Sequence, residues 1–146
     1  MEKYDSGMAR RVWDRVWAEP EAGDRGHMMM REAQALADYT KLQRQIPELK
    51  LLTRDTRRHL ACLRGIKLLK DGQFPAPVAM KAKEEPLETA LRRCYALSLK
   101  AAGEYEALSE DPEYGCVYAQ LADTKRRHCR LLLELLGRED RVYLHK

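Results

Sequence analysis

The chain contains two stretches that read as copies of one helical hairpin, and this repeat constrains the fold more than any other feature. Each copy carries an Arg-Arg-His triplet, at Arg57-Arg58-His59 and at Arg126-Arg127-His128. The repeat predicts two similar helical halves. Aligning the copies on these histidines matches apolar residues at helical spacing: Leu52 with Leu121, Leu63 with Leu132, and Ile66 with Leu135.

Upstream of each triplet, a polar residue precedes a tyrosine by seven residues. The pair is Glu32 and Tyr39 in the first copy, and Ser98 and Tyr105 in the second. Seven residues make about two helical turns, so each pair shares one helix face. The first copy therefore carries an acid where the second carries a hydroxyl.

Composition favours a single all-α domain. The 146 residues suffice to bury about two-thirds of the unfolded surface. The chain is 45% hydrophobic and 34% charged, with one Phe, a mixture that favours helix over strand. Basic residues alternate with acidic ones and the net charge is only +4, which indicates solvated helix surfaces rather than a nucleic-acid interface.

The cysteines and the charged start of the chain predict a cytoplasmic protein that contacts no membrane. Cys62, Cys94, Cys116 and Cys129 form no CxxC pair, so we expect reduced thiols in or near the core. The first residues are charged throughout, and no apolar run approaches the roughly 20 residues of a membrane span.

Prolines and glycines divide the chain into elements. Residues 1–25 are predicted to form an N-terminal appendage, with a short helix to about Trp17, and residues 26–146 the helical domain. Three prolines and a glycine make residues 71–86 a long crossing segment. The predicted helices cover about 26–43, 47–69, 87–108 and 111–137, followed by a short frayed tail.

Both hairpins resemble the rubrerythrin-type branch of the ferritin-like superfamily. In that branch, a helix with a metal-binding Glu and an aromatic residue seven positions later precedes a helix with Leu-Ala, Glu-x-x-His and a Leu-rich turn. The resemblance spans about residues 28–137 and includes no rubredoxin domain. It implies a ferritin-like antiparallel four-helix bundle of two helical hairpins joined by a long crossover.

The resemblance also implies where a di-iron site would lie. The leading acid positions hold Glu32 and Ser98, the motif histidines are His59 and His128, and the bridging carboxylate positions hold Thr56 and Lys125. Three of six ligands remain and both bridges are replaced, one of them by a cation that repels metal ions. The site is therefore incomplete, and we expect no oxidoreductase activity.

Two arrangements of the former site are open. In one, the Lys125 ammonium occupies the vacated metal volume and pairs with Glu32, while in the other Lys125 extends to solvent. Glu32, His59 and His128 either bind one iron or zinc ion or bond to neighbouring side chains. No other cofactor is expected. In the first arrangement a polar network completes the core, formed by Tyr39, Thr56, Ser98 and Tyr105.

Two classes of function follow from these alternatives. Thr56, Ser98 and Lys125 favour a non-catalytic helical binding or assembly module, which forms a homodimer or binds a helical protein partner. Glu32, His59 and His128 favour a residual metal-binding protein with a redox or metal-handling role.

Overall fold

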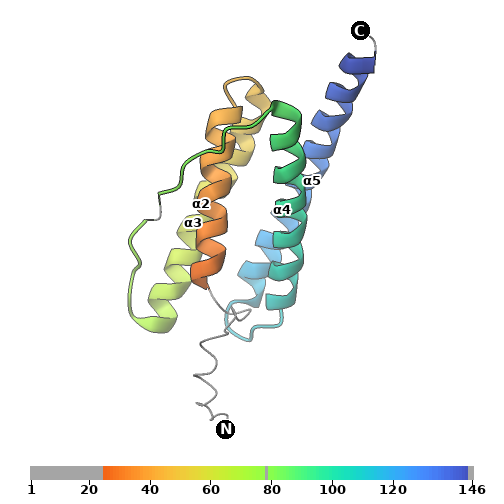
Figure 1. Ribbon diagram of the computed structural model, residues 1–146. Helices are drawn as coiled ribbons and strands as arrows, with labels where there is room; N and C mark the ends of the chain where they lie inside the picture. Colours follow the sequence, from red (N-terminus) through yellow and green to blue (C-terminus); the bar gives the residue numbers. More distant parts are fainter. Residues whose placement is uncertain (1–24, 78, 145–146) are drawn as a thin grey trace, which may run out of the picture.

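The computed structural model describes residues 25–77 and 79–144 and is all-helical over these ranges, with no strand (Figure 1). The predicted N-terminal helix to about Trp17 lies outside the described residues. The helices are α2 (Arg25–Leu42), α3 (Lys50–Asp71), α4 (Leu87–Leu108) and α5 (Gly115–Leu144), with a 3-10 turn at Pro47–Leu49. None of these helices is long and apolar enough to cross a membrane.

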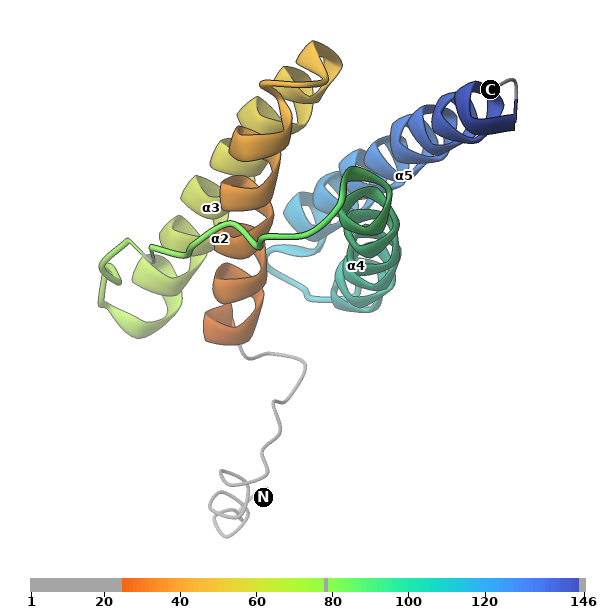
Figure 2. The same ribbon diagram turned by 45° about the horizontal axis from the view of Figure 1, so that its top comes forward.

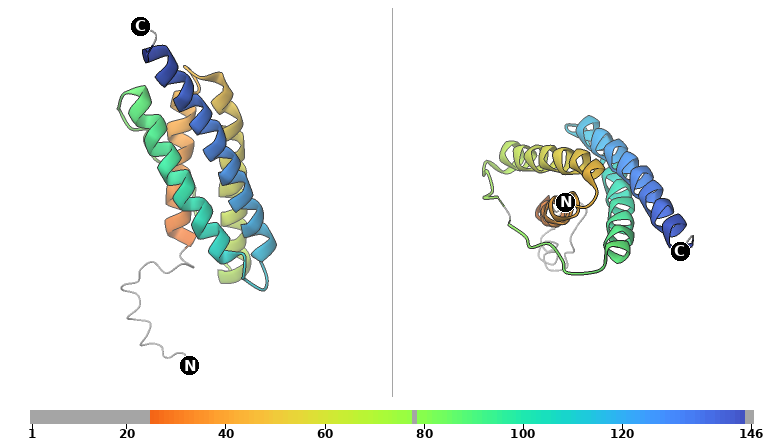
Figure 3. Two further views of the ribbon diagram at one scale, coloured as in Figure 1. Left: turned by 90° about the vertical axis from the view of Figure 1, so that its right-hand side faces the viewer. Right: turned by 90° about the horizontal axis from the view of Figure 1, so that it is seen from above.

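The helices form two antiparallel hairpins, α2 with α3 and α4 with α5, that pack into a four-helix bundle. The segment 72–86 returns the chain to the opposite end, so α3 and α4 run in the same direction (Figure 1 and Figure 3). Figure 2 shows this segment crossing over α2. It is held there by Lys83 N–H, which donates to Asp38 Oδ1 at 3.1 Å, and by Gln34 Nε2, which donates to the Lys81 carbonyl at 2.9 Å.

The core consists of two apolar clusters. One contains Leu52, Leu132 and Leu135, and the other contains Leu63, Ile66 and Leu121. In each pair aligned by the repeat, one member lies in the first cluster and its partner in the second. The two copies are thus related as the halves of an approximate two-fold arrangement.

Polar and glycine residues set the helix boundaries. Gly72 ends α3 in the left-handed conformation, with φ of 77° and its N–H donating to the Leu68 carbonyl at 2.8 Å. Asp111 Oδ1 accepts from Glu113 N–H and Tyr114 N–H, both at 2.8 Å, so it caps the turn before α5.

Two sequence predictions are wrong. Helix α5 continues through Gly137 to Leu144, because one glycine inside a helix costs only about 1 kcal/mol and Arg138 ties this part of α5 to Glu48 at 2.9 Å. Cys94 and Cys129 are buried as predicted, but Cys62 and Cys116 are exposed. Cys62 lies beside the buried stripe of α3 rather than on it.

Candidate functional site

A layer of buried polar side chains lies inside the bundle at the level of the two histidines. All six positions derived from the di-iron pattern are at most 3% exposed. Each helix contributes to the layer, because the repeat places the same positions inward in both hairpins. The six are Glu32 from α2, Thr56 and His59 from α3, Ser98 from α4, and Lys125 and His128 from α5.

Glu32 is the centre of this layer. Lys125 Nζ lies 3.0 Å from Glu32 Oε1, with the Glu32 side chain fully buried and the Lys125 side chain 3% exposed. Tyr105 Oη donates to Glu32 Oε2 at 2.6 Å, and His59 Nδ1 lies 3.5 Å from Oε1. The ammonium therefore stays inside the bundle and pairs with Glu32, the first of the two arrangements expected from the sequence.

The surroundings keep Glu32 ionised. Burial alone would raise the pKa of its carboxyl, but Lys125, His59 and the Tyr105 hydroxyl together hold that pKa well below its usual range. Burial and the Glu32 carboxylate raise the pKa of the Tyr105 phenol, which therefore remains a donor. The result is a paired, hydrogen-bonded internal charge.

The two hydroxyl residues among these six positions have other partners. Ser98 Oγ and Tyr39 Oη form a buried hydrogen bond at 3.1 Å. Thr56 Oγ1 donates to the Leu52 carbonyl of its own helix at 2.7 Å. The predicted polar network is therefore divided, since Thr56 and the Tyr39–Ser98 pair show no hydrogen bond to Glu32.

The two motif histidines stack, with ring centroids 6.0 Å apart and an interplanar angle of 19°. His128 Nε2 lies 3.0 Å from Asp55 Oδ2. Burial and the nearby Lys125 lower the pKa of His128 to about 4, although Asp55 acts in the opposite direction. His128 is therefore neutral at neutral pH and donates from Nε2 to Asp55.

Sequence reasoning missed Asp55 and a second acidic residue, Asp38. Asp55 stands one helical turn before His59, a spacing that could have marked it. Asp38 is 3% exposed and accepts from Arg93 Nη1 at 2.8 Å, while Arg93 Nε donates to Glu85 at 2.6 Å. This cluster joins α2, the crossing segment and α4, which gives it a structural role.

The residues at the centre do not fit a di-iron cluster. The Lys125 ammonium stands beside the only carboxylate of the six, and the Thr56 and Ser98 hydroxyls are bonded elsewhere. No group of three or more His, Cys, Asp or Glu side chains in residues 25–77 and 79–144 is arranged to hold a metal ion. One ion bound by Glu32, His59 and His128 stays a prediction.

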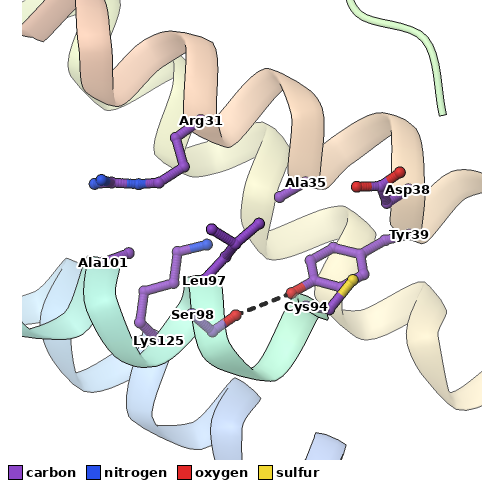
Figure 4. Close-up of a pocket in the computed structure, with 9 residues that line it drawn as sticks. All are labelled: Arg31, Ala35, Asp38, Tyr39, Cys94, Leu97, Ser98, Ala101 and Lys125. Carbon is purple, nitrogen blue, oxygen red and sulfur yellow. Dashed lines mark hydrogen bonds between the residues drawn. The ribbon is translucent and has the colours of Figure 1, made fainter. Parts of the chain in front are cut away.

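A small cavity between α2 and α4 adjoins the layer (Figure 4). Its volume is about 10 Å³, close to the space one water molecule needs. Figure 4 shows the Lys125 side chain extending between the helices beside Leu97, with the Tyr39–Ser98 hydrogen bond next to it. Cys94 also lines the cavity, and burial raises the pKa of its thiol to about 12. This space is too small for an organic substrate.

Comparison of the chain with protein-family models, with curated proteins and with solved structures finds no match. The resemblance to rubrerythrins therefore rests on the spacing of the residues named above.

Proposed function

We propose that this chain is a rubrerythrin-related, ferritin-like bundle whose di-iron centre has been replaced by an internal ion pair, and that it acts as a non-catalytic helical binding or assembly module in the cytoplasm. The observation that carries this proposal is the 3.0 Å contact between Lys125 Nζ and Glu32 Oε1.

The charges at the centre support this proposal. Two closely spaced iron ions need bridging carboxylates to neutralise them. Here an ammonium group occupies one bridging position, and a single carboxylate balances its charge. Only about 10 Å³ remains free beside Lys125, so the centre offers no room for a substrate.

A module with a closed core acts through its surface. Large exposed apolar side chains occur on α3, α4 and α5, among them Leu51, Leu99 and Leu133, which are 46%, 53% and 51% exposed. Helical partners commonly bind such surfaces through leucines of their own. We therefore propose a second copy of this chain, or a helical protein, as the partner.

Sedimentation equilibrium over about 1 to 200 μM tests self-assembly. We expect a dimer that weakens when one of these exposed leucines is replaced, with Leu51→Gln, Leu99→Gln and Leu133→Gln tested singly. Glu134→Gln serves as an exposed control on α5.

Metal analysis of protein purified without chelators or an affinity tag tests the core. A stoichiometric di-ferric centre with peroxide turnover would overturn the proposal.

One observation favours the alternative, a mononuclear iron or zinc protein with a metal-handling or redox role. Within residues 25–77 and 79–144, the Nδ1 atoms of His59 and His128 are buried and form no hydrogen bond, although His59 Nδ1 lies 3.5 Å from Glu32 Oε1. Titration with Zn²⁺ followed by calorimetry distinguishes the two functions. Saturable one-to-one binding that is lost in His59→Ala and His128→Ala, but kept in His27→Ala, would favour the metal protein.

A further inference from the structure

A larger groove lies between α3 and α5. Its volume is about 190 Å³, far more than the 10 Å³ of the cavity beside Lys125. Figure 3 shows these two helices side by side and running in opposite directions. Residues from both helices line the groove, including Arg58, His59 and Cys62 from α3 and Gln120, Thr124 and Arg127 from α5.

The repeat explains why two arginines meet here. Arg58 and Arg127 are the middle residues of the two Arg-Arg-His triplets, so they are equivalent positions of the two copies. Because α3 and α5 run antiparallel, these equivalent positions line one groove from opposite walls. The two guanidinium groups therefore belong to a single concave site.

Neither arginine has a carboxylate partner within the described ranges. Arg127 Nη2 donates only to the Thr124 hydroxyl, at 3.0 Å, and Arg58 forms no ion pair or hydrogen bond there. By contrast, Arg93 and Arg126 each pair with two carboxylates.

The carboxylate that lines the groove, Asp55, already contacts two other side chains. Asp55 Oδ2 lies 3.0 Å from His128 Nε2, and Asp55 Oδ1 lies 3.7 Å from Arg54 Nη2. Among the residues that line the groove, one carboxylate is thus opposed by two guanidinium groups, those of Arg58 and Arg127. The groove carries net positive charge, and its concave shape strengthens the attraction for an anion.

We propose that this groove binds a small oxyanion, either inorganic phosphate or the phosphate of a small monoester, between Arg58 and Arg127. The planar guanidinium fork matches two oxygens of a phosphate, and each arginine has free N–H donors for such a contact. The inner wall is His59, whose Nδ1 faces Glu32 at 3.5 Å, so one imidazole ring separates the groove from the buried ion pair. The site does not depend on the proposed assembly role.

The site can be tested by titrating the natural chain with inorganic phosphate at constant ionic strength. The backbone amide NMR shifts report the binding. We expect saturable shifts that centre on Arg58, Thr124 and Arg127, with a dissociation constant in the millimolar range. Arg58→Gln and Arg127→Gln should each weaken binding at least about five-fold. Both side chains are exposed, so neither substitution should unfold the chain.

Arg57→Gln is the matched control, because it removes the same charge from an exposed neighbour that does not line the groove. It should change phosphate affinity less than about two-fold, the effect of lost long-range charge alone. Shifts that do not saturate, or equal affinities in Arg57→Gln and Arg58→Gln, would reject the site.

A second titration with phenyl phosphate distinguishes the two sources of the oxyanion. Tighter binding than inorganic phosphate, with added shifts at Cys62 and Gln120, would assign the remaining groove volume to the organic part of a monoester. Equal or weaker binding would assign the site to the free ion.

Discussion

The two hairpins share one framework but carry different charges in it. Tyr39 and Tyr105, His59 and His128, and the aligned leucines occupy the same positions in both copies. The polar residues differ, because the acid of the centre, Glu32, belongs to the first hairpin and the ammonium, Lys125, to the second. Neither hairpin alone can balance its own buried charge.

The hydrogen bonds also cross between hairpins. Tyr105 of the second copy donates to Glu32 of the first, and Tyr39 of the first contacts Ser98 of the second. His128 contacts Asp55 in the same crossed manner. We therefore expect the difference between the copies to specify how the halves dock, a role attested for some buried polar groups in other proteins.

The largest effect on folding should follow from giving both copies the same set of carboxylate and imidazole residues. The triple variant Thr56→Glu, Ser98→Glu, Lys125→Glu restores all six carboxylate and imidazole ligands implied by the resemblance. Without metal its buried carboxylates repel one another, so we expect poor folding that added Fe²⁺ rescues, with about two irons per chain. The measurements are iron content and the unfolding temperature with and without Fe²⁺.

The double variant Thr56→Glu, Ser98→Glu is the control for that experiment. It keeps the Lys125 ammonium, which should exclude iron. Iron uptake equal to that of the triple variant, or none in the triple variant, would show that these residues do not mark a former metal site.

The next effect concerns the ion pair itself. Lys125→Ala leaves the Glu32 carboxylate buried without its counter-charge, and we expect the free energy of unfolding to fall by about 3 to 5 kcal/mol. Lys100→Ala removes an exposed lysine of α4 and should cost well under about 1 kcal/mol. Urea denaturation at neutral pH measures both values. Equal small losses in the two variants would contradict a buried pair.

Acid should destabilise the folded chain through His128. The pKa of His128 is about 4 in the folded chain against an ordinary 6.5, so the unfolded chain takes up the proton first. Its contribution to stability is complete above about pH 6.5 and is lost as the pH falls toward 4, by at most about 3 kcal/mol. Glu32 affects stability at lower pH than His128 does. Because the pKa of Glu32 is depressed in the folded chain, the stability that it adds is lost only as the pH falls below 4.5, the ordinary pKa of the group.

Urea denaturation at pH 7, 5.5 and 4.5 measures this loss. His128→Gln should flatten the dependence between pH 7 and 4.5, while His27→Gln, which changes an exposed histidine, should leave it unchanged. A natural chain whose unfolding midpoint is constant across this range would contradict the lowered pKa of His128.

Periodicity predicted the features that depend on one helix at a time. The buried leucines of the repeat and the bounds of α4 follow from helical spacing and from the prolines, whereas spacing left open whether Lys125 turns inward or extends to solvent. The contact between Asp55 and His128 depends on how α3 lies against α5, which spacing within either helix does not determine. The end of α5 was missed because Gly137 alone is too weak a breaker.

The smallest expected effect is the difference in stability loss between Tyr105→Phe and Tyr39→Phe. Tyr105 donates to a charged carboxylate at 2.6 Å, whereas Tyr39 and Ser98 form a neutral hydrogen bond at 3.1 Å. Hydrogen bonds to charged groups contribute about 1.5 to 3 kcal/mol and neutral ones about 1 kcal/mol. Tyr105→Phe should therefore destabilise the chain about twice as much as Tyr39→Phe. The control Tyr118→Phe removes a buried hydroxyl that has no hydrogen-bond partner in residues 25–77 and 79–144, so it should cost less than either. If urea denaturation gives equal losses of unfolding free energy for Tyr105→Phe and Tyr39→Phe, then Tyr105 does not donate to a charged carboxylate while Tyr39 contacts a neutral hydroxyl.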